Sequence, residues 1–321
     1  MEYSRTIPQQ DHPTAVALGL FDGLHRGHRA VIGQAVSCAP ALRPAVFTFT
    51  FDGEATKPDF ANILTHTRKL DILRRLGVEV VCEPPFSSFR ELSPREFFEE
   101  ILVKRLRAAA IFCGEDYRFG KNAAGDAALL RRFCAEAGVR FHLVAPLLDG
   151  GEPVSSTRIR RLLRDGEMAE AARLLGEPYI IDYPVSHGRQ LGRKMGYPTI
   201  NQLYPAGDLL PRSGVYAAAA FAGGSWHPAV TNVGVKPTLG GTDAPSAETT
   251  LLDFDGDLYG QRVPVAFFTF LRPEQRFDSV ELLFEQVARD AKQSARLFPE
   301  MEQSFLKKCL TTPDGSDIIE R

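Results

Sequence analysis

The sequence predicts an α/β protein of two domains: a doubly wound parallel sheet in the first half, and a small antiparallel β-barrel with a closing helix in the second. In the first half, short apolar runs alternate with amphipathic stretches, which is the pattern of parallel βαβ units. After about Gly176, proline and glycine become frequent, and strand-like runs follow one another without helices between them. With 321 residues, the chain is long enough for each half to bury its own core.

Five strands and four helices are expected in the first half. The strands are apolar runs rich in Val, Phe and Ala: Ala15–Leu18, Ala45–Phe49, Val78–Cys82, Ala109–Cys113 and Arg140–Val144. The helices are the amphipathic stretches Arg29–Ser37, Thr67–Leu76, one that begins at Ser93, and Ala127–Ala137. Ser93 starts an N-cap, proline and capping-box sequence that ends at Glu96. Ligands of such sheets bind at the carboxyl ends of the strands, near the switch point.

The second half is expected to hold five strands and one long helix. The strands are Tyr179–Val185, Gly214–Phe221, Trp226–Asn232, Glu248–Phe254 and Val263–Leu271, with glycine pairs marking turns. Ser279 caps an amphipathic helix over Val280–Ala295. The boundary is expected at residues 176–182, which gives domains of residues 1–177 and 183–321.

Composition excludes several classes of protein. The apolar fraction is 44%, the charged fraction is 24% and the formal net charge is −2, which argues against a nucleic-acid partner. No run approaches the roughly 20 apolar residues that span a bilayer, and residues 1–13 lack the apolar core of a signal peptide, so no membrane partner is expected. Five widely spaced cysteines without a CxxC pair indicate reduced thiols. We therefore expect a cytoplasmic protein, whose oligomeric state the sequence does not reveal.

The segment GLFDGLHRGH, from Gly19 to His28, is the first candidate site. It begins where a strand is expected to end and finishes inside the first helix, and Gly19 and Gly23 allow the backbone to approach a ligand closely. His25 and His28 are three residues apart and share one face of the first helical turn. A helix N-terminus with imidazole donors is suited to phosphate. The alternative is a metal-binding or surface histidine pair, for which no third ligand lies nearby in the sequence.

A second segment, VSSTRIR from Val154 to Arg160, precedes another amphipathic helix. Ser156 and Thr157 offer hydroxyls, and Arg160 offers a planar guanidinium. Taken alone, this segment is a routine helix cap. Combined with the first segment, it becomes a clamp for the β- and γ-phosphates of a nucleotide.

The second half opens with the basic, glycine-rich segment HGRQLGRKMGYPTIN, from His187 to Asn201. Such a turn is able to cover a triphosphate, although glycine-rich loops near barrels are common. Thr199 and Asn201 are two apart in an extended segment and therefore point to one side. Their hydroxyl and amide oxygens suit Mg²⁺ that is already bound by phosphates. The alternative is a polar strand start.

These motifs resemble those of the bacterial bifunctional riboflavin kinases/FMN adenylyltransferases. HxGH followed by SSTxxR is the pattern of the nucleotidyltransferase superfamily, and GEDYRFGKNAAGD (Gly114–Asp126) narrows the likeness to the FAD synthetase module. PTIN is similar to the flavokinase motif GxPTAN. The segments SGVYA, NVGVKPT, AETTLLDF, DLYG and LRPEQRF follow it in the flavokinase order. The resemblance implies a nucleotidyltransferase-like domain followed by a flavokinase-like barrel.

The resemblance also implies roles in adenylyl transfer from ATP to FMN. The implied ATP-binding residues are Gly19, Phe21, Asp22, Gly23, His25, His28, Asp116, Ser156, Thr157 and Arg160, with His25 and His28 catalytic. Thr48 and Phe49 are further candidate contacts, in a segment TFTFDG where many members carry TFxPHP. The anionic phosphate of FMN is able to attack the α-phosphate directly, so positioning and charge stabilisation carry the rate.

For phosphorylation of riboflavin, the resemblance implies Glu248 as the general base and Mg²⁺ held by Thr199 and Asn201. Thr250 stands where the family often has a histidine. Arg272, Glu274 and Phe277 are the implied flavin contacts. The implied ATP-binding residues of the kinase are Gly188, Arg189, Gly192, Lys194, Gly196, Thr199 and Asn232. The expected ligands are therefore riboflavin, FMN, FAD and ATP, with Mg²⁺ as cofactor.

Three other functions remain compatible with the sequence. One is an enzyme with only the adenylyltransferase activity, although Thr199, Asn201 and Glu248 are all present. Another is a nucleotidyltransferase that acts on nicotinate mononucleotide or phosphopantetheine, against which the flavokinase-like half argues. The last is a flavin carrier that consumes no ATP.

Overall fold

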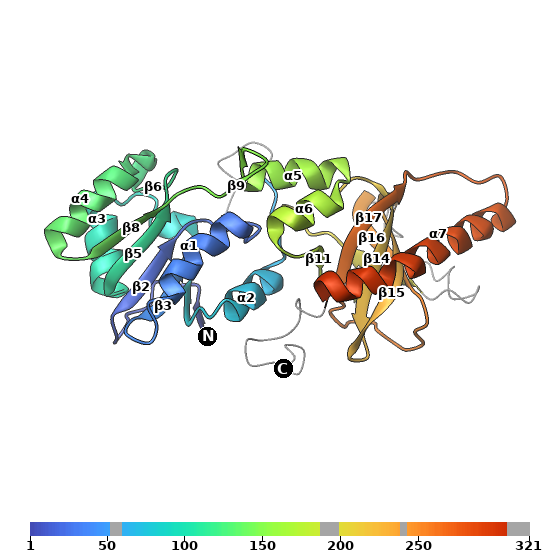
Figure 1. Cartoon of the computed structure of the whole chain (residues 1–321), viewed down its shortest axis with the longest axis horizontal. Helices are drawn as coiled ribbons and strands as arrows, with labels where there is room; N and C mark the ends of the chain where they lie inside the picture. Colours follow the sequence, from blue (N-terminus) through green and yellow to red (C-terminus); the bar gives the residue numbers. More distant parts are fainter. Residues whose placement is uncertain (52–59, 187–198, 238–242, 307–321) are drawn as a thin grey trace. The chain divides into compact units, whose positions relative to one another are not determined.

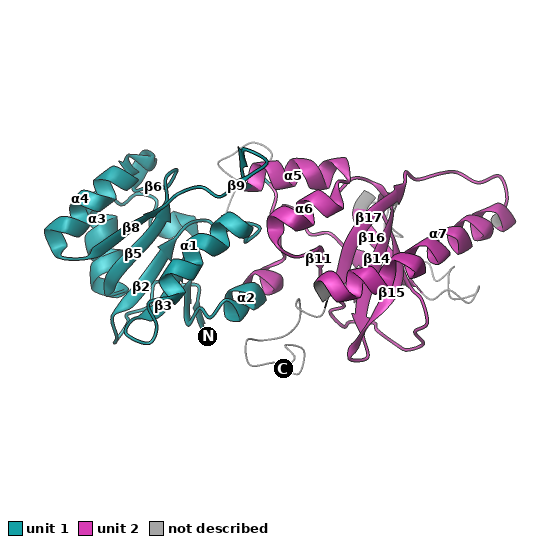
Figure 2. Cartoon of the chain, in the orientation of Figure 1, with its two compact units in different colours: residues 1–60, 70–155, 312–315 teal, residues 61–69, 156–311, 316–321 magenta. Residues whose placement is uncertain are grey.

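The computed structural model describes residues 1–51, 60–186, 199–237 and 243–306. Its contacts divide the chain into two compact units, shown in different colours in Figure 2. The first unit contains Met1–Phe60 and Leu70–Ser155, and the second contains Ala61–Lys69 and Ser156–Thr311. The two units are described separately below. The boundary between two functional domains at residues 176–182 stays a prediction.

The first unit is built on a six-stranded parallel sheet (Figure 1). Its strands are β1 (Glu2–Ser4), β2 (Thr14–Leu18), β3 (Arg43–Phe47), β4 (Val80–Cys82), β5 (Ala108–Gly114) and β8 (Arg140–Val144). They lie in the order β1-β4-β3-β2-β5-β8, and every neighbouring pair is parallel. The chain moves outward from β2 through β3 to β4 and then returns to β5 on the other side of β2. The predicted doubly wound sheet is thus confirmed, and its switch point lies between β2 and β5.

Helices cover this sheet as the apolar periodicity predicts. They are α1 (Arg26–Val36), α3 (Pro94–Glu96), the π-helix η2 (Phe97–Arg105) and α4 (Ala127–Ala137). Helix α2 (His66–Arg75) is divided between the units, with His66–Lys69 in the second and the remainder in the first. Ser93 and Glu96 form the predicted capping box at the start of α3. The short elements are η1 (Phe86–Ser88), β6 (Arg118–Phe119), η3 (Lys121–Ala123), β7 (Gly125–Asp126), β9 (Leu148–Asp149) and β10 (Glu152–Pro153). Helix α1 packs on β2, β3 and β5, which fixes its N-terminus beside the switch point.

The second unit consists of two helices, a curled antiparallel sheet that forms a half-barrel, and a long C-terminal helix (Figure 1). The first two helices are α5 (Ser156–Asp165) and α6 (Met168–Leu175). The strands are β11 (Tyr179–Ile181), β12 (Val185–Ser186), β13 (Thr199–Leu203), β14 (Gly214–Ala222), β15 (Ser225–Pro237), β16 (Asp243–Leu251) and β17 (Val265–Arg272). They lie in the order β11-β17-β14-β15-β16-β13-β12.

The last helix, α7 (Val280–Met301), continues into η5 (Glu302–Leu306) and packs on β14 and β15. Ser279 caps α7 as predicted, by accepting a hydrogen bond from the backbone N–H of Leu282. Fully buried Ser294 donates its hydroxyl hydrogen to the carbonyl oxygen of Ala229 on β15 at 2.6 Å. A buried hydrogen bond therefore joins the closing helix to the half-barrel.

Candidate active sites

The loop between β2 and α1 adopts a backbone that few residues tolerate. Gly23 has a φ of 80°, and the non-glycine residues Phe21 and Leu24 have φ values of 51° and 41°. Gly19 has no room for a side chain, because a Cβ atom there would lie 2.9 Å from the ring of Phe21. Strain of this kind clusters at ligand-binding loops. The loop starts at the carboxyl end of β2, which is the predicted position of the site.

His25 and His28 form a stacked pair at the start of α1. His25 is the N-cap of the helix, and its Nδ1 accepts a hydrogen bond from the backbone N–H of His28 at 3.3 Å. The two rings stack with centroids 3.6 Å apart, and the ring of Phe21 meets His28 edge-on at 5.4 Å. The structure therefore brings both predicted histidines together at a helix N-terminus, where partial positive charge favours anions.

The protonation state of His25 follows from its surroundings. Burial, assisted by the positive charge of Arg29, lowers the pKa of His25 from 6.5 to about 4. The ring is therefore neutral at neutral pH. Because Nδ1 accepts a hydrogen bond, the single proton of the neutral ring is on Nε2. His25 thus offers a fixed N–H donor and adds no positive charge.

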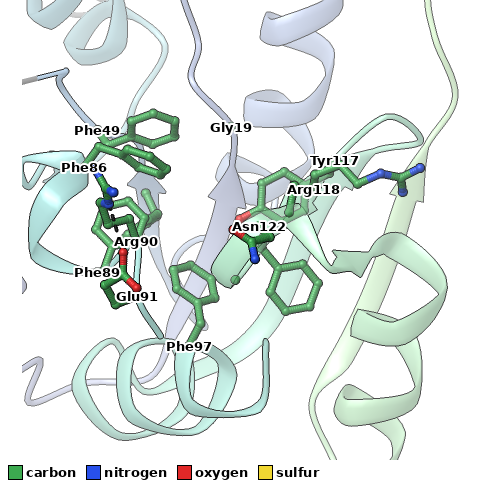
Figure 3. Close-up of a pocket in the computed structure, with 14 residues that line it drawn as sticks. Gly19, Phe49, Phe86, Phe89, Arg90, Glu91, Phe97, Tyr117, Arg118 and Asn122 are labelled. Carbon is green, nitrogen blue, oxygen red and sulfur yellow. Dashed lines mark hydrogen bonds and ion pairs between the residues drawn. The ribbon is translucent and has the colours of Figure 1, made fainter. Parts of the chain in front are cut away.

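A cavity of about 450 Å³ lies beside Gly19, at the carboxyl ends of the parallel strands (Figure 3). Phe49, Phe86 and Phe89 line one side, while Tyr117 and Asn122 lie opposite them. The aromatic rings contact one another, as between Phe49 and Phe86, whose centroids are 5.1 Å apart. This size and aromatic lining suit a flat, fused-ring ligand.

Sequence reasoning missed this cavity, although it included Phe49 among the candidates. The phenylalanines come from four separate segments: the end of β3 with the residues after it, η1 with its flank, the start of η2, and β6. No periodicity connects these segments. The only signal in the sequence was the density of phenylalanine, 22 residues in all.

The other predicted residues of the first unit lie near the same edge of the sheet. Asp116 is exposed just beyond the end of β5, on the other side of the switch point from β3. Asp22 is buried in the loop after β2. Thr48 is fully buried and donates its hydroxyl hydrogen to the carbonyl oxygen of Leu20 at 2.7 Å. This hydrogen bond helps to hold the loop after β2 in place.

Ser156, Thr157 and Arg160 belong to the second unit, in the first two turns of α5. Thr157 is exposed, and Ser156 and Arg160 are half-buried. Arg160 donates from Nε to the carbonyl oxygen of Ala61, in the segment that joins the second unit from the first half of the chain. Ile159 and Leu163 of the same helix are fully buried, which fixes α5 in place.

In the half-barrel, three of the predicted kinase residues lie in one row across three strands. Asn201 on β13 pairs directly with Glu248 on β16, which in turn pairs with Asn232 on β15. Thr199 pairs with Thr250 in the next row on the same face. Directly paired residues point to the same side of a sheet, so these five polar side chains share one face. The predicted common face of Glu248 and Thr250 is confirmed by this register.

The three predicted flavin contacts have defined partners in this unit. Arg272 binds Asp290 of α7 through two nitrogens, at 3.0 and 2.8 Å. Glu274 accepts a hydrogen bond from Asn232 Nδ2 at 3.1 Å. The ring of half-buried Phe277 lies 5.8 Å from the guanidinium carbon of Arg272.

The predicted loop residues Gly188, Arg189, Gly192, Lys194 and Gly196 lie outside the described residues. Within the described ranges, no group of three or more His, Cys, Asp or Glu side chains is placed to hold a metal ion. A search of the same ranges found no helix long and apolar enough to cross a membrane.

Comparisons with known proteins agree on both halves of the chain. The FAD synthetase family matches residues 7–158, and the riboflavin kinase family matches residues 175–298. The bifunctional riboflavin kinase/FMN adenylyltransferase of Listeria monocytogenes is 33% identical over 301 residues, which cover 89% of this chain and 93% of the relative. The enzyme of the same name from Escherichia coli K12 is 35% identical, covering 86% of this chain and 90% of the relative.

A solved structure has the same architecture over nearly its whole length. It is titled as a macrolide-efflux protein from Streptococcus pneumoniae, with a TM-score of 0.80 and 31% sequence identity, and it matches 92% of this chain and 99% of its own. Both family matches, the near-complete coverage of the curated relatives and the two sites lead to one conclusion. The chain belongs to the family of bifunctional riboflavin kinases/FMN adenylyltransferases.

Proposed function

We propose that this chain makes FAD from riboflavin in two ATP-dependent reactions. Residues 183–321 phosphorylate riboflavin to FMN, and residues 1–177 transfer AMP from ATP to FMN with release of pyrophosphate. The single observation that carries the proposal is that each half holds its own polar constellation where its fold creates a site. One is the stacked histidine pair at the switch point, and the other is the row of Asn201, Glu248 and Asn232.

In adenylyl transfer, an oxygen of the FMN phosphate forms a bond to the α-phosphorus of ATP while the bond to pyrophosphate breaks. No proton has to leave the nucleophile, because the phosphate is already anionic. The fixed Nε2–H of neutral His25 and the ring of His28 stabilise charge that builds on the phosphates. The N-terminus of α1 supports the same charge with its partial positive end.

The aromatic cavity beside Gly19 receives the isoalloxazine ring of FMN. Its volume of about 450 Å³ suits a ligand of that size, and Phe49, Phe86 and Tyr117 offer faces and edges for stacking. Because the cavity adjoins Gly19, the phosphate end of FMN is directed toward the loop that leads to His25. Around that loop, Phe21, Asp22, Gly23 and Asp116 form the remainder of the proposed nucleotide site.

On the strength of the nucleotidyltransferase likeness, Ser156, Thr157 and Arg160 of α5 bind the β- and γ-phosphates. Ser156 and Thr157 supply hydroxyls at a helix N-terminus, and Arg160 supplies a guanidinium whose Nε is already held by the carbonyl oxygen of Ala61. A guanidinium fixed in this way loses less freedom when it binds an anion.

In riboflavin phosphorylation, the 5′-hydroxyl oxygen attacks the γ-phosphorus of ATP, its proton passes to Glu248, and ADP leaves. Glu248 lies between two amide side chains in its row, which keeps a carboxylate close to polar partners. The loop residues Gly188, Arg189, Gly192, Lys194 and Gly196 cover the triphosphate, on the strength of the flavokinase likeness.

The oxygen donors of Thr199 and Asn201 on β13 suit magnesium. Thr199 and Asn201 share a face and offer a hydroxyl and an amide oxygen, which are hard, neutral ligands for an ion that also binds phosphate oxygens. When bound, the ion would neutralise charge on the β- and γ-phosphates. Thr250, directly opposite Thr199, supplies a further hydroxyl at this place.

The proposal is tested by incubating the full chain with riboflavin and MgATP and resolving riboflavin, FMN and FAD over time. FMN should appear first and FAD should follow. FAD formed only from supplied FMN would indicate an adenylyltransferase with an inactive second half, and binding without ATP consumption would indicate a flavin carrier. We propose a cytoplasmic location for this activity, where ATP is available.

A further inference from the structure

Asn232 in the middle of the kinase row has an amide whose orientation is fixed. Its Nδ2 donates to Glu274 Oε1 at 3.1 Å. A carboxylate only accepts hydrogen bonds, so the amide atom beside it must be the nitrogen. The carbonyl oxygen Oδ1 is consequently directed away from Glu274. It is buried, and it accepts no hydrogen bond from any residue in the described parts of the chain.

The position of Glu274 is itself built into the fold. The carboxylate lies over Gly234, two residues after Asn232 on the same strand, where a Cβ atom would come within 2.6 Å of Glu274 Oε1. Only glycine leaves room for the carboxylate at this point. Glu274 therefore reaches Asn232 in this position because residue 234 is a glycine.

A second contact holds the segment that carries Glu274. Arg272, two residues earlier at the end of β17, binds Asp290 of α7 through two nitrogens. Asp290 is buried and also accepts a hydrogen bond from Gln286 at 2.9 Å. Arg272 is thus engaged by the closing helix, and it fixes the chain from which Glu274 reaches back over β15.

We infer that Glu274 is a positioning residue of the kinase site, which acts through Asn232 and not by direct contact with the flavin. It holds the Asn232 amide so that Oδ1 faces the substrates as an acceptor. Oδ1 accepts a hydrogen bond from a donor group of a substrate, such as a hydroxyl of riboflavin or a hydroxyl or amino group of ATP. This inference rests on the proposed kinase function and deepens it.

A double-mutant cycle in the full chain tests the inference. Asn232→Ala, Glu274→Ala and the double variant are compared for kcat/KM of riboflavin phosphorylation. Losing a hydrogen bond to a charged group should cost each single variant about tenfold. If Glu274 acts through Asn232, the double variant should be no worse than either single one. Gly234→Ala should reproduce the defect of Glu274→Ala, because its methyl group displaces the carboxylate.

Two controls separate this role from a loss of folding. Glu285→Gln removes an exposed carboxylate on α7 that contacts Arg289 at 3.7 Å, and it should leave riboflavin phosphorylation unchanged. Conversion of supplied FMN to FAD and the melting temperature should stay the same in all cycle variants. Multiplicative defects in the double variant, or wild-type activity in Glu274→Ala, would overturn the inference.

The affinities of the same double-mutant cycle variants for each ligand can also be measured, and these measurements need no turnover. Riboflavin binding is followed by flavin fluorescence, and ATP binding by titration with the non-hydrolysable analogue AMP-PNP and Mg²⁺. Coupled losses of affinity for one ligand identify which substrate donates to Asn232 Oδ1, and independent losses refute the coupling. If the unmodified chain forms no FMN, the kinase proposal fails, while these titrations still decide whether Glu274 acts through Asn232.

Discussion

Replacing His25 separates two roles that this side chain combines. Its Nδ1 caps α1, and its Nε2–H is the donor that we propose for the nucleotide phosphates. Asparagine caps helices well but lacks the imidazole donor, whereas alanine lacks both. Both His25→Asn and His25→Ala should therefore lose the same factor in FAD formation, about 10²–10³, which is typical for one donor to a developing charge. FMN formation should be unchanged in both variants.

The stability of the two variants should differ. Losing an N-cap costs about 1 kcal/mol, and losing the stack on His28 at 3.6 Å costs about 0.5–1.5 kcal/mol. His25→Ala loses both contributions, about 2 kcal/mol together, whereas His25→Asn loses mainly the stack. For a unit of this size, the two melting temperatures should differ by about 2–4 °C at neutral pH.

The pH dependence of stability gives an independent check. The pKa of His25 is lowered from 6.5 to about 4, mainly by burial and also by Arg29. Between these pH values the unfolded chain binds more protons than the native chain, so the free energy of unfolding falls as the pH falls. The contribution of His25 is complete above pH 6.5 and is lost near pH 4. It amounts to about 3 kcal/mol over the window, at about 1.4 kcal/mol per pH unit.

Scanning calorimetry at pH 7, 6 and 5, with hydrogen exchange of the α1 amides, measures this difference. The stability advantage of the unmodified chain over His25→Asn should shrink steadily as the pH falls. A constant difference would mean that His25 is not buried as a neutral ring. A less than threefold change in FAD formation by His25→Asn, with chemistry rate-limiting, would remove His25 from the adenylyl-transfer site.

Three further changes address the other parts of the molecule. Glu248→Gln keeps the shape of the side chain but removes the proposed general base. FMN formation should therefore fall about 10²–10⁴-fold, while supplied FMN is still converted to FAD. A less than threefold loss of FMN formation refutes the role of Glu248 as the base. Phe49→Ala should raise the KM for FMN at least fivefold, since stacking on an aromatic ring contributes about 1 kcal/mol or more, and should leave riboflavin phosphorylation unchanged. Glu177→Ala removes a carboxylate that pairs with buried Arg68, which should destabilise the second unit by about 3 kcal/mol. The fluorescence of Trp226 during urea unfolding measures this change, and an unchanged midpoint contradicts it.

Much of the fold could be predicted because its elements carry local signals. The five apolar strands of the first half correspond to β2, β3, β4, β5 and β8 within a few residues. Edge strand β1 was missed, because its three residues are polar or aromatic and none of them is fully buried, so they show no apolar run. The predicted strand Tyr179–Val185 is two strands, β11 and β12, since the chain turns at Asp182–Pro184 between them. Glu248 was expected near the start of its strand, which in fact begins at Asp243.

Contacts between distant segments were beyond sequence reasoning. Ala61–Lys69 lies in the middle of the first half of the chain, yet it belongs to the second unit by its contacts. There, the hydroxyl of Thr65 donates to Asp182 at 2.5 Å, and Arg68 pairs with Glu177 at 3.5 Å, all of them buried. Nothing in the sequence around Thr65 indicates partners more than a hundred residues away. The aromatic cavity of the first unit was missed for the same physical reason.

Motifs of the second half predicted residues that the fold brings together. Asn201, Glu248 and Asn232 came from three separate motifs, and strand register alone places them side by side. Arg272 and Glu274, in contrast, were assigned to the flavin as members of one motif. The structure gives them different partners, Asp290 for the first and Asn232 for the second. This motif therefore contains one residue that binds α7 and one that accepts a hydrogen bond from a neighbouring strand, and the contact of both with flavin stays a prediction.

The replacement of the family's usual histidine by Thr250 can be judged from the same register. Thr250 lies directly opposite Thr199 and one row away from the pair of Glu248 and Asn201. An imidazole at that position would stand beside a proposed magnesium ligand and compete with it as a nitrogen donor. A threonine hydroxyl instead adds a hard, neutral oxygen of the kind that magnesium prefers. At this position Thr250 therefore offers Thr199 a second hydroxyl in the row next to Glu248, and the role of Glu248 as the base stays a prediction.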